Sequence, residues 1–183
     1  MKIKTKRLLL RPLRNADADS IVENVNNLNV SRWLLVVPYP YNKKSAMVWI
    51  NGNKKKMRKK EKDDYSFGIE ILEENKIIGG IGIHRVDSYQ KTASVGYWLG
   101  EKYWNKGYCS EALKAVIDFG FRKLKLNRLE ASVFVGNPSS GRLLEKFGFK
   151  QEGLKRKSVR CKADGKVKDE HMYGLLKVDY KIR

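Results

Sequence analysis

Cysteine is scarce in this chain, and its two copies, Cys109 and Cys161, lie far apart in the sequence. They provide neither a disulfide framework nor the spacing of a zinc site, so we predict no metal. No run of 18 apolar residues occurs, and no apolar segment follows a basic N-terminus. This argues against a membrane span and a secretory signal. These absences favour a cytoplasmic protein with no membrane partner.

Acidic residues are also few, with 20 Asp and Glu against 39 Lys and Arg, which gives a formal net charge of +19. Such an excess favours polyanions such as RNA, because binding releases their counterions. Solvated lysine faces would produce the same count. A length of 183 residues suits one domain with a sizeable core and is short for two. We therefore predict a single domain over residues 1–183.

The stretch from Thr92 to Ala112 combines a strand pattern, a loop and a helix pattern. Apolar residues alternate up to Leu99, and from Glu111 they recur with a helical period. The intervening segment, Trp104 to Ser110, is short and holds mostly small or polar residues. Free amides and the dipole at a helix N-terminus suit an anion such as a phosphate. An ordinary turn that contains one glycine is the alternative.

A second segment, Asn137 to Phe149, follows another alternating strand, Leu129 to Val135. Asn137 is a favoured N-cap residue, and Pro138 is favoured at the first helical position. The sequence therefore predicts a helix that begins directly after Asn137.

Together these two segments resemble the GNAT superfamily of N-acetyltransferases, most closely its RimJ/RimL-like branch, which acetylates the N-termini of ribosomal proteins. In that branch a Gly-Tyr-Trp strand leads into a Trp-Gly-Lys-Gly-Tyr-Ala-like loop, and an Asn-x-x-Ser helix ends in Glu-Lys-x-Gly-Phe. The chain has both motifs in order, at 96–109 and 137–149. The resemblance extends from Thr5-Lys6-Arg7-Leu8 to Tyr173-Gly174-Leu175-Leu176.

The expected architecture is an α/β chain with the GNAT fold, in which a mixed, mainly antiparallel sheet of about seven strands is flanked by about four helices. Strands are predicted near 6–12, 65–72, 76–85, 92–99, 129–135, 158–162 and 167–176. The first two helices are predicted from apolar stripes at Ile21, Val22, Val25, Leu28 and at Ala46, Trp49, Ile50, Met57. The resemblance further implies that the central strands, 92–99 and 129–135, splay apart and hold the pantetheine arm of acetyl-CoA.

The resemblance implies a set of acetyl-CoA-binding residues. Backbone amides of the loop would hold the pyrophosphate, with the Lys106 side chain near the phosphates, at Asn105, Lys106, Gly107, Tyr108, Cys109 and Ser110. The backbone at Trp98 and Leu99 would bind pantetheine, and Asn137 and Lys146 would lie on the cofactor side. Trp104, Asn105 and Cys109 depart from the superfamily pattern. In place of glycine, Asn105 requires an ordinary or a tolerated left-handed backbone conformation.

The catalytic residues are less clearly marked than the cofactor loop. Ser140 matches the serine whose hydroxyl, in relatives, can protonate the leaving thiolate; the alternative is a polar residue in the first turn of a capped helix. The general base is missing, because Ser94 stands where many relatives carry Glu. His84, Asp87 and Glu130 are candidates, of which His84 has the suitable intrinsic pKa. A lone histidine at a strand end is nevertheless more often structural.

The missing carboxylate bears on the acceptor. Deprotonating an α-amine at pH 7 costs about 1 kcal/mol, whereas a lysine side chain costs about 4.6 kcal/mol, so a weak base suffices for an N-terminus. The net charge would also repel a cationic polyamine or aminoglycoside. We therefore predict direct acetyl transfer to a protein N-terminal α-amine, such as that of a ribosomal protein. The alternatives are a small-molecule amine acetyltransferase, for an amino sugar, antibiotic or polyamine, and a catalytically weakened relative that binds CoA or RNA.

Two further segments bear on partners. Trp33 and Tyr39 belong to a proline-punctuated loop that borders the acceptor groove in similar enzymes; alternatively they cover the edge of the core together with Tyr41. The basic run Lys54 to Lys62 is a candidate RNA or ribosome contact or, alternatively, a solvated helix face. An acyl intermediate on Cys109 is disfavoured because the residue lies inside the cofactor loop. Relatives are monomers or homodimers.

Overall fold

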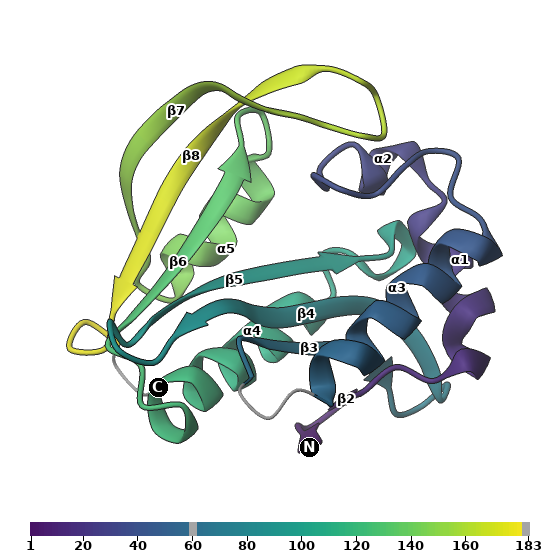
Figure 1. Cartoon of the computed structure of the whole chain (residues 1–183), viewed down its shortest axis with the longest axis horizontal. Helices are drawn as coiled ribbons and strands as arrows, with labels where there is room; N and C mark the ends of the chain where they lie inside the picture. Colours follow the sequence, from purple (N-terminus) through teal and green to yellow (C-terminus); the bar gives the residue numbers. More distant parts are fainter. Residues whose placement is uncertain (59–61, 181–183) are drawn as a thin grey trace.

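The computed structural model describes residues 1–58 and 62–180, which form a sheet flanked by helices (Figure 1). The strands are β1 (Ile3–Lys4), β2 (Leu8–Arg11), β3 (Asp64–Ile71), β4 (Lys76–Asp87), β5 (Thr92–Leu99), β6 (Arg128–Phe134), β7 (Lys150–Arg160) and β8 (Val167–Leu176). The α-helices are α1 (Ala18–Val25), α2 (Leu28–Ser31), α3 (Lys43–Met57), α4 (Tyr108–Asp118) and α5 (Pro138–Lys146). Short helical turns lie at Asn15–Asp17, Glu101–Tyr103 and Phe119–Lys123.

The sheet has the order β1-β2-β3-β4-β5-β6-β8-β7, and every neighbouring pair is antiparallel except β5 and β6. The predicted mixed, mainly antiparallel α/β sheet is confirmed. The strand beyond the predicted seven is β1, which pairs with β2 through Ile3 and Leu10.

Two element boundaries differ from the prediction. The first helix ends at Val25, and Leu28 begins α2 with 38% of its surface exposed, so its assignment to the buried stripe is wrong. The break follows from Asn27, whose side chain accepts a hydrogen bond from the Asn29 amide and caps a new helix. Strand β7 begins at Lys150 rather than near 158. The prediction missed its first part because those residues are mostly charged and exposed and show no apolar alternation.

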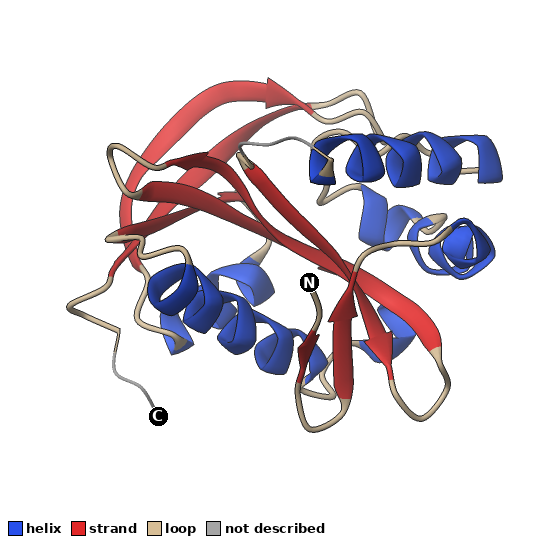
Figure 2. Ribbon diagram, turned by 60° about the horizontal axis from the view of Figure 1, so that its bottom comes forward, coloured by secondary structure: helices blue, strands red, loops and turns tan. Residues whose placement is uncertain are grey.

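The helices form two groups on opposite faces of the sheet (Figure 2). On one face α4 buries Leu113 and Ile117 against strand residues such as Ile81. On the other face Ile21 of α1 and Ile50 of α3 pack around Ile77. In each of these helices the buried apolar residues lie three or four positions apart, as expected for one face of an amphipathic helix. Within the described residues, no helix combines the length and apolarity that crossing a membrane requires.

A buried ion network joins the first strands. The Arg11 guanidinium on β2 donates to Asp17 Oδ2 at 2.7 Å and to Glu70 Oε2 on β3 at 2.5 Å. Burial alone would raise the pKa of Asp17, but hydrogen bonds from Arg11 and the Arg14 amide hold it below its ordinary value. Because Asp17 lies directly before α1, the network connects the start of this helix to the sheet. Removing one member would leave an uncompensated buried charge, so the connection is costly to break.

The central strands separate along their length. β5 and β6 pair in parallel only from Thr92 with Arg128 to Ser94 with Glu130. Beyond that point β5 continues to Leu99 alongside β4, while β6 continues to Phe134 alongside β8. The predicted splay of the two strands is confirmed, and it opens a gap at the middle of the sheet (Figure 1).

The hairpin of β7 and β8 curves away from the sheet toward α2 (Figure 1). Its connecting segment contacts the residues that follow α2: the Lys162 amide donates to Leu35 O at 3.2 Å, and the Cys161 thiol lies 3.6 Å from Arg32 O. Gly165 has a φ of +67°, which suits glycine in the turn that joins the two strands. The tip of the hairpin and the 32–35 segment are therefore in contact and form one continuous edge of the molecule, which we call the rim.

Candidate active site

The predicted phosphate loop joins β5 to the N-terminus of α4. Gly107, the residue before the helix, has a φ of +79°, and Asn105 has a φ of +58°. Both lie in the left-handed region, where glycine is unstrained and asparagine is among the better tolerated other residues. The helix ladder starts with the Glu111 amide donating to Gly107 O. The amides of Tyr108, Cys109 and Ser110 therefore have no acceptor within the helix and suit an anion.

Arg7 braces this loop from the N-terminal segment. Its guanidinium donates to Lys106 O at 2.9 Å, pairs with Glu111 at 2.7 Å and lies 4.4 Å above the Tyr108 ring. Thr5 Oγ1 also donates to Glu111 at 2.6 Å. Burial alone would raise the pKa of Glu111, but the hydrogen bonds from Thr5 and Arg7 hold it below its ordinary value. The sequence argument used Thr5 and Arg7 only as marks of resemblance and missed this contact.

Trp104, one of the departures from the superfamily pattern, fastens the other end of the loop. Its indole Nε1 donates to Leu99 O, at the end of β5, at 2.8 Å. Burial raises the pKa of the Cys109 thiol to about 12, so this thiol is protonated near neutral pH. The loop therefore supplies backbone donors rather than a nucleophile.

Ser140 lies beside the gap between β5 and β6. Asn137 caps α5 by accepting a hydrogen bond from the Ser140 amide at 3.3 Å, which confirms the predicted N-cap. Tyr97 on β5 donates its hydroxyl to Ser140 O at 3.3 Å, and burial raises the pKa of that phenol. Tyr97 thus links β5 to α5 where the two strands have separated. Only the alternation of β5 could have drawn attention to this tyrosine.

A cavity of about 520 Å³ lies between α4 and α5. It brings together Gly107 and Ser110 of the loop with Lys146 at the end of α5. Its wall also includes Phe147 and Tyr180. Three residues predicted for the cofactor therefore share one cavity, although two separate motifs carry them.

His84 lies on the sheet face opposite α4, at the point where the gap begins. It is directly opposite Ser94 in the β4–β5 register, and Ser94 is opposite Glu130 in the β5–β6 register. Its ring covers glycines, because a Cβ at Gly82 would lie 2.9 Å from His84 Nε2 and one at Gly96 would lie 3.8 Å from it. Because Gly82 and Gly96 have no side chains, the His84 ring lies close to the backbone of β4 and β5.

Asp64 orients the His84 ring, and the sequence argument did not identify it. Asp64 Oδ2 lies 2.9 Å from His84 Nδ1 and 2.8 Å from Lys56 Nζ, while Ser66 donates to Oδ1 at 2.7 Å. Burial alone would raise the pKa of Asp64, but these three hydrogen bonds hold it well below its ordinary value. An ionised carboxylate only accepts hydrogen bonds, so Nδ1 carries the proton and Nε2 of the neutral ring is a proton acceptor.

The other candidates for a base have different partners. Asp87 Oδ1 accepts hydrogen bonds from the amides of Tyr89 and Gln90 and shapes the β4–β5 turn. Glu130 accepts from Arg128 Nε at 2.9 Å. Ser94, at the position of the missing Glu, accepts from the Arg85 guanidinium at 2.7 Å.

The aromatic residues of the loop after α2 differ in their exposure. Tyr41 is 6% exposed and lies in the core, and burial raises its pKa to about 12. Tyr39 is 44% exposed. The Arg32 guanidinium carbon and Lys168 Nζ each lie 5.4 Å from the centroid of the Trp33 ring. Tyr41 thus covers the core, whereas Tyr39 and Trp33 remain at the rim of the molecule.

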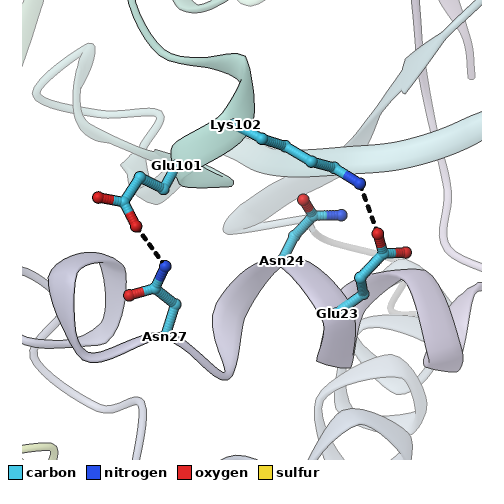
Figure 3. A pocket seen from close by; sticks show the side chains of 5 residues that line it. All are labelled: Glu23, Asn24, Asn27, Glu101 and Lys102. Atoms are coloured by element: carbon cyan, nitrogen blue, oxygen red, sulfur yellow. Dashed lines mark hydrogen bonds and ion pairs between the residues drawn. The ribbon is translucent and has the colours of Figure 1, made fainter.

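A smaller pocket of about 290 Å³ lies between α1 and the turn after β5 (Figure 3). Its charged groups have partners: Lys102 forms an ion pair with Glu23, and Glu101 accepts a hydrogen bond from the side-chain amide of Asn27. Asn24 fills the space beside Gly100, since a Cβ there would lie 2.1 Å from Asn24 Oδ1. This pocket contains none of the predicted site residues and serves to dock α1 against the end of β5. No group of three or more potential metal ligands occurs among the described residues.

Comparison with known proteins identifies the family in which this loop, this gap and these two motifs occur together. Residues 7–150 match the family described as the acetyltransferase (GNAT) domain. This protein is a GNAT acetyltransferase. Separated central strands are a feature of the GNAT fold. Members of this family are N-acetyltransferases, and the chain is therefore an N-acetyltransferase.

Individual GNAT relatives match either nearly the whole chain or part of it. An uncharacterised N-acetyltransferase, p20, from Bacillus licheniformis is 34% identical over 178 residues, which cover 96% of each chain. The ribosomal-protein-serine acetyltransferase of Escherichia coli is 36% identical over 83 residues, or 45% of this chain and 46% of that one. The crystal structure of a GNAT-family acetyltransferase from Bacillus anthracis has a TM-score of 0.81 and 28% identity, covering 96% of this chain and 98% of that one.

Proposed function

We propose that this enzyme transfers the acetyl group of acetyl-CoA directly to the N-terminal α-amine of a protein. The observation that carries the proposal is the alignment of three features along β5: the loop at its end, the gap beside it and His84 opposite Ser94, near its start. Similarity to a ribosomal-protein-serine acetyltransferase supports a protein N-terminus as the acceptor. The absence of a carboxylate at Ser94 also supports it, because an α-amine needs only a weak base.

Acetyl-CoA would lie along the gap. The free amides at the start of α4 would hold its pyrophosphate, with Lys106 nearby, and the cavity between α4 and α5 would take the nucleotide end beside Lys146. The backbone of Trp98 and Leu99 would bind pantetheine, since β5 has no partner on its β6 side there. The thioester would then lie near Ser140, between α5 and β5.

The reaction would proceed in one displacement. The amine nitrogen attacks the thioester carbonyl, the carbon–sulfur bond breaks, and the amine gives up a proton to Nε2 of His84, directly or through one water. Asp64 holds the ring in place by accepting a hydrogen bond from its Nδ1 proton. The hydroxyl of Ser140 donates a proton to the leaving thiolate. Trp33 and Tyr39 would border the acceptor at the rim.

The test is release of free CoA thiol from acetyl-CoA with a panel of acceptors. The panel contains peptides that begin with Ala, Ser or Met, the same peptides with blocked N-termini and one internal lysine, spermidine, an aminoglycoside and no acceptor. We expect release with the free N-termini alone. Faster release with spermidine or the aminoglycoside would overturn the acceptor class, and faster release with the blocked peptides would assign the activity to lysine side chains.

A further inference from the structure

The β7–β8 hairpin concentrates positive charge on one exposed surface. Residues 150–168 contain eight Lys or Arg and two acidic residues. β7 is the last strand of the sheet, and every residue in it is exposed except Val159, which is partly buried. An edge strand with exposed lysines resists pairing with other strands, but it does not require this many cations.

The two acidic residues within 150–168 already have partners, and the two that follow in β8, Asp169 and Glu170, accept hydrogen bonds from the Lys157 amide and the Ser158 hydroxyl. Glu152 pairs with Arg128, and Asp164 pairs with Lys168 at 2.8 Å. Six exposed cations have side chains with no ion-pair partner within the described part of the chain: Lys155, Arg156, Lys157, Arg160, Lys162 and Lys166. Of these, Arg160 donates a hydrogen bond to Gly165 O. Their charge is therefore directed to solvent.

The basic run predicted from the sequence is used differently. Lys54 donates to Asn15 Oδ1 at 2.6 Å, and Lys56 pairs with Asp64 at 2.8 Å. Residues 59–61 of this run lie outside the described residues. Two of its cations thus hold α3 against neighbouring elements. Among the described residues of the run, three cations have no polar side-chain partner, Lys55, Arg58 and Lys62, whereas the hairpin has five, Lys155, Arg156, Lys157, Lys162 and Lys166.

The composition of the hairpin points to one class of partner. Residues 150–168 contain no aromatic residue, and their exposed apolar side chains are Leu154, 50% exposed, and Val167, 45% exposed. Protein interfaces are anchored by aromatic residues, and membrane-surface segments insert Trp, Phe or Leu. A row of cations along an 11-residue strand, about 36 Å long at 3.3 Å per residue, instead matches a repeated anion such as a phosphate backbone.

We propose that the β7–β8 hairpin is an RNA-binding surface that contacts phosphates without reading base sequence. The tip of the hairpin joins the rim next to Trp33, through the Lys162 amide and Lys168. An acceptor N-terminus on an RNA-bound protein would therefore be held beside the acceptor site. This consequence for the acceptor rests on the proposed function, whereas RNA binding itself does not.

The experiment measures binding of a fluorescein-labelled 20-nucleotide oligouridylate without acetyl-CoA, across a series of salt concentrations. The hairpin variant carries Lys155→Gln, Arg156→Gln, Lys162→Gln and Lys166→Gln. The matched control carries Lys2→Gln, Lys4→Gln, Lys123→Gln and Lys125→Gln, four exposed lysines on other elements. Melting temperature and acetyl-CoA binding check that both variants fold.

We expect the hairpin variant to bind RNA about tenfold more weakly at 0.1 M salt, with the control within about twofold of the unmodified protein. Each lost phosphate contact lowers the slope of log affinity against log salt by about 0.7, so four contacts lower it by about 3. Equal losses in both variants would overturn the proposal, because the binding would then follow net charge alone.

Other outcomes also contradict the proposal. They are failure of the unmodified protein to bind the oligonucleotide at 0.1 M salt, displacement of RNA by polyglutamate at equal charge concentration, and tighter binding to phosphatidylserine vesicles than to RNA. Thiol release with a short peptide is measured separately on both variants and is expected to be unchanged. Loss of RNA binding with intact turnover, or the reverse, therefore separates a failure of this proposal from a failure of the proposed function.

Discussion

The two sides of β5 are built in different ways. On the side of α4 and α5, the loop at 104–110 is held by Arg7, Glu111 and Trp104, and two contiguous motifs supply most of the site. On the opposite side, His84 is held by Asp64, and the surrounding residues come from separate strands and from α3. The side proposed for the cofactor is thus organised by local sequence, and the side proposed for the acceptor by strand register.

This difference explains why the acceptor side is harder to identify. A helix N-terminus binds an anion with backbone groups, so its signature is a short run of suitable residues. Proton transfer needs a side chain at one position in space, and many registers could supply it. Substitutions on each side should therefore affect different kinetic constants.

The largest effect is expected at His84. His84→Gln removes the proton acceptor while keeping an amide of similar size, and should lower kcat for a peptide acceptor about 100-fold, with KM for acetyl-CoA little changed. His171→Gln replaces the other histidine of the chain and should retain activity within about twofold. Steady-state thiol release measures both. An active His84→Gln variant would assign the proton transfer to Glu130 or to water.

Gly107 tests the cofactor side. Gly107→Val places a β-branched side chain at a φ of +79°, which costs about 1–2 kcal/mol and tilts the first amides of α4. We expect KM for acetyl-CoA to rise at least about tenfold. Gly165→Val is the matched control, because Gly165 also has a positive φ, +67°, and nothing within 4 Å of an added Cβ. Isothermal titration with CoA compares them, and equal losses would mean that the strain acts through global stability.

Arg7 tests whether the contacts that support the 104–110 loop affect acetyl-CoA binding as well as the loop itself. Arg7→Ala removes the ion pair with Glu111, the contact with Lys106 O and the stacking on Tyr108, and should raise KM for acetyl-CoA about five- to tenfold with kcat nearly unchanged. Arg7→Lys should recover part of this loss. Arg122→Ala breaks an exposed helical pair with Asp118 and serves as the control. A fall in kcat for Arg7→Ala would argue for a role beyond positioning the loop.

Asp64 gives a pH-dependent test of the acceptor side. Its folded-state pKa is depressed, so its stabilising contribution is complete above its unfolded value, near 4, and is lost as pH falls through the folded value. We expect Asp64→Asn to lower the free energy of unfolding by about 1–2 kcal/mol at pH 7, because it removes a buried, triply hydrogen-bonded carboxylate. The difference should shrink as pH falls below 4. Urea denaturation at pH 7, 4 and 3 measures it, and a constant difference would contradict the assignment.

The smallest effect is expected at Cys109. Cys109→Ala should leave kcat and KM within about twofold, because the raised pKa of the thiol keeps it protonated and the loop uses backbone amides. Thiol release and mass spectrometry of the enzyme after incubation with acetyl-CoA check this. An acetylated cysteine that disappears when the peptide acceptor is added would instead indicate a covalent route.

The sequence alone was sufficient for features that arise within one contiguous segment. The alternation of Thr92 to Leu99, the cap at Asn137 and the stripe of α3 at Ala46, Trp49 and Ile50 each depend on neighbours in the chain, and each appears as predicted. Met57, the last residue of the predicted stripe, is not part of this core. The family motifs predicted the splay of β5 and β6, because the resemblance carries the fold with it.

Tertiary structure decided what joins distant segments. Arg7 and Glu111, or Asp64 and His84, become partners only when the sheet pairs β3 with β4 and brings the N-terminal segment to α4. Nothing in the period or composition of either segment encodes such a contact, since each residue alone resembles an ordinary surface charge. The same holds for the basic residues: sequence singled out Lys54 to Lys62, but side-chain pairing and the edge position of β7 place the free charge on the hairpin. Free charge depends on which partners lie within reach, and only the folded chain determines that.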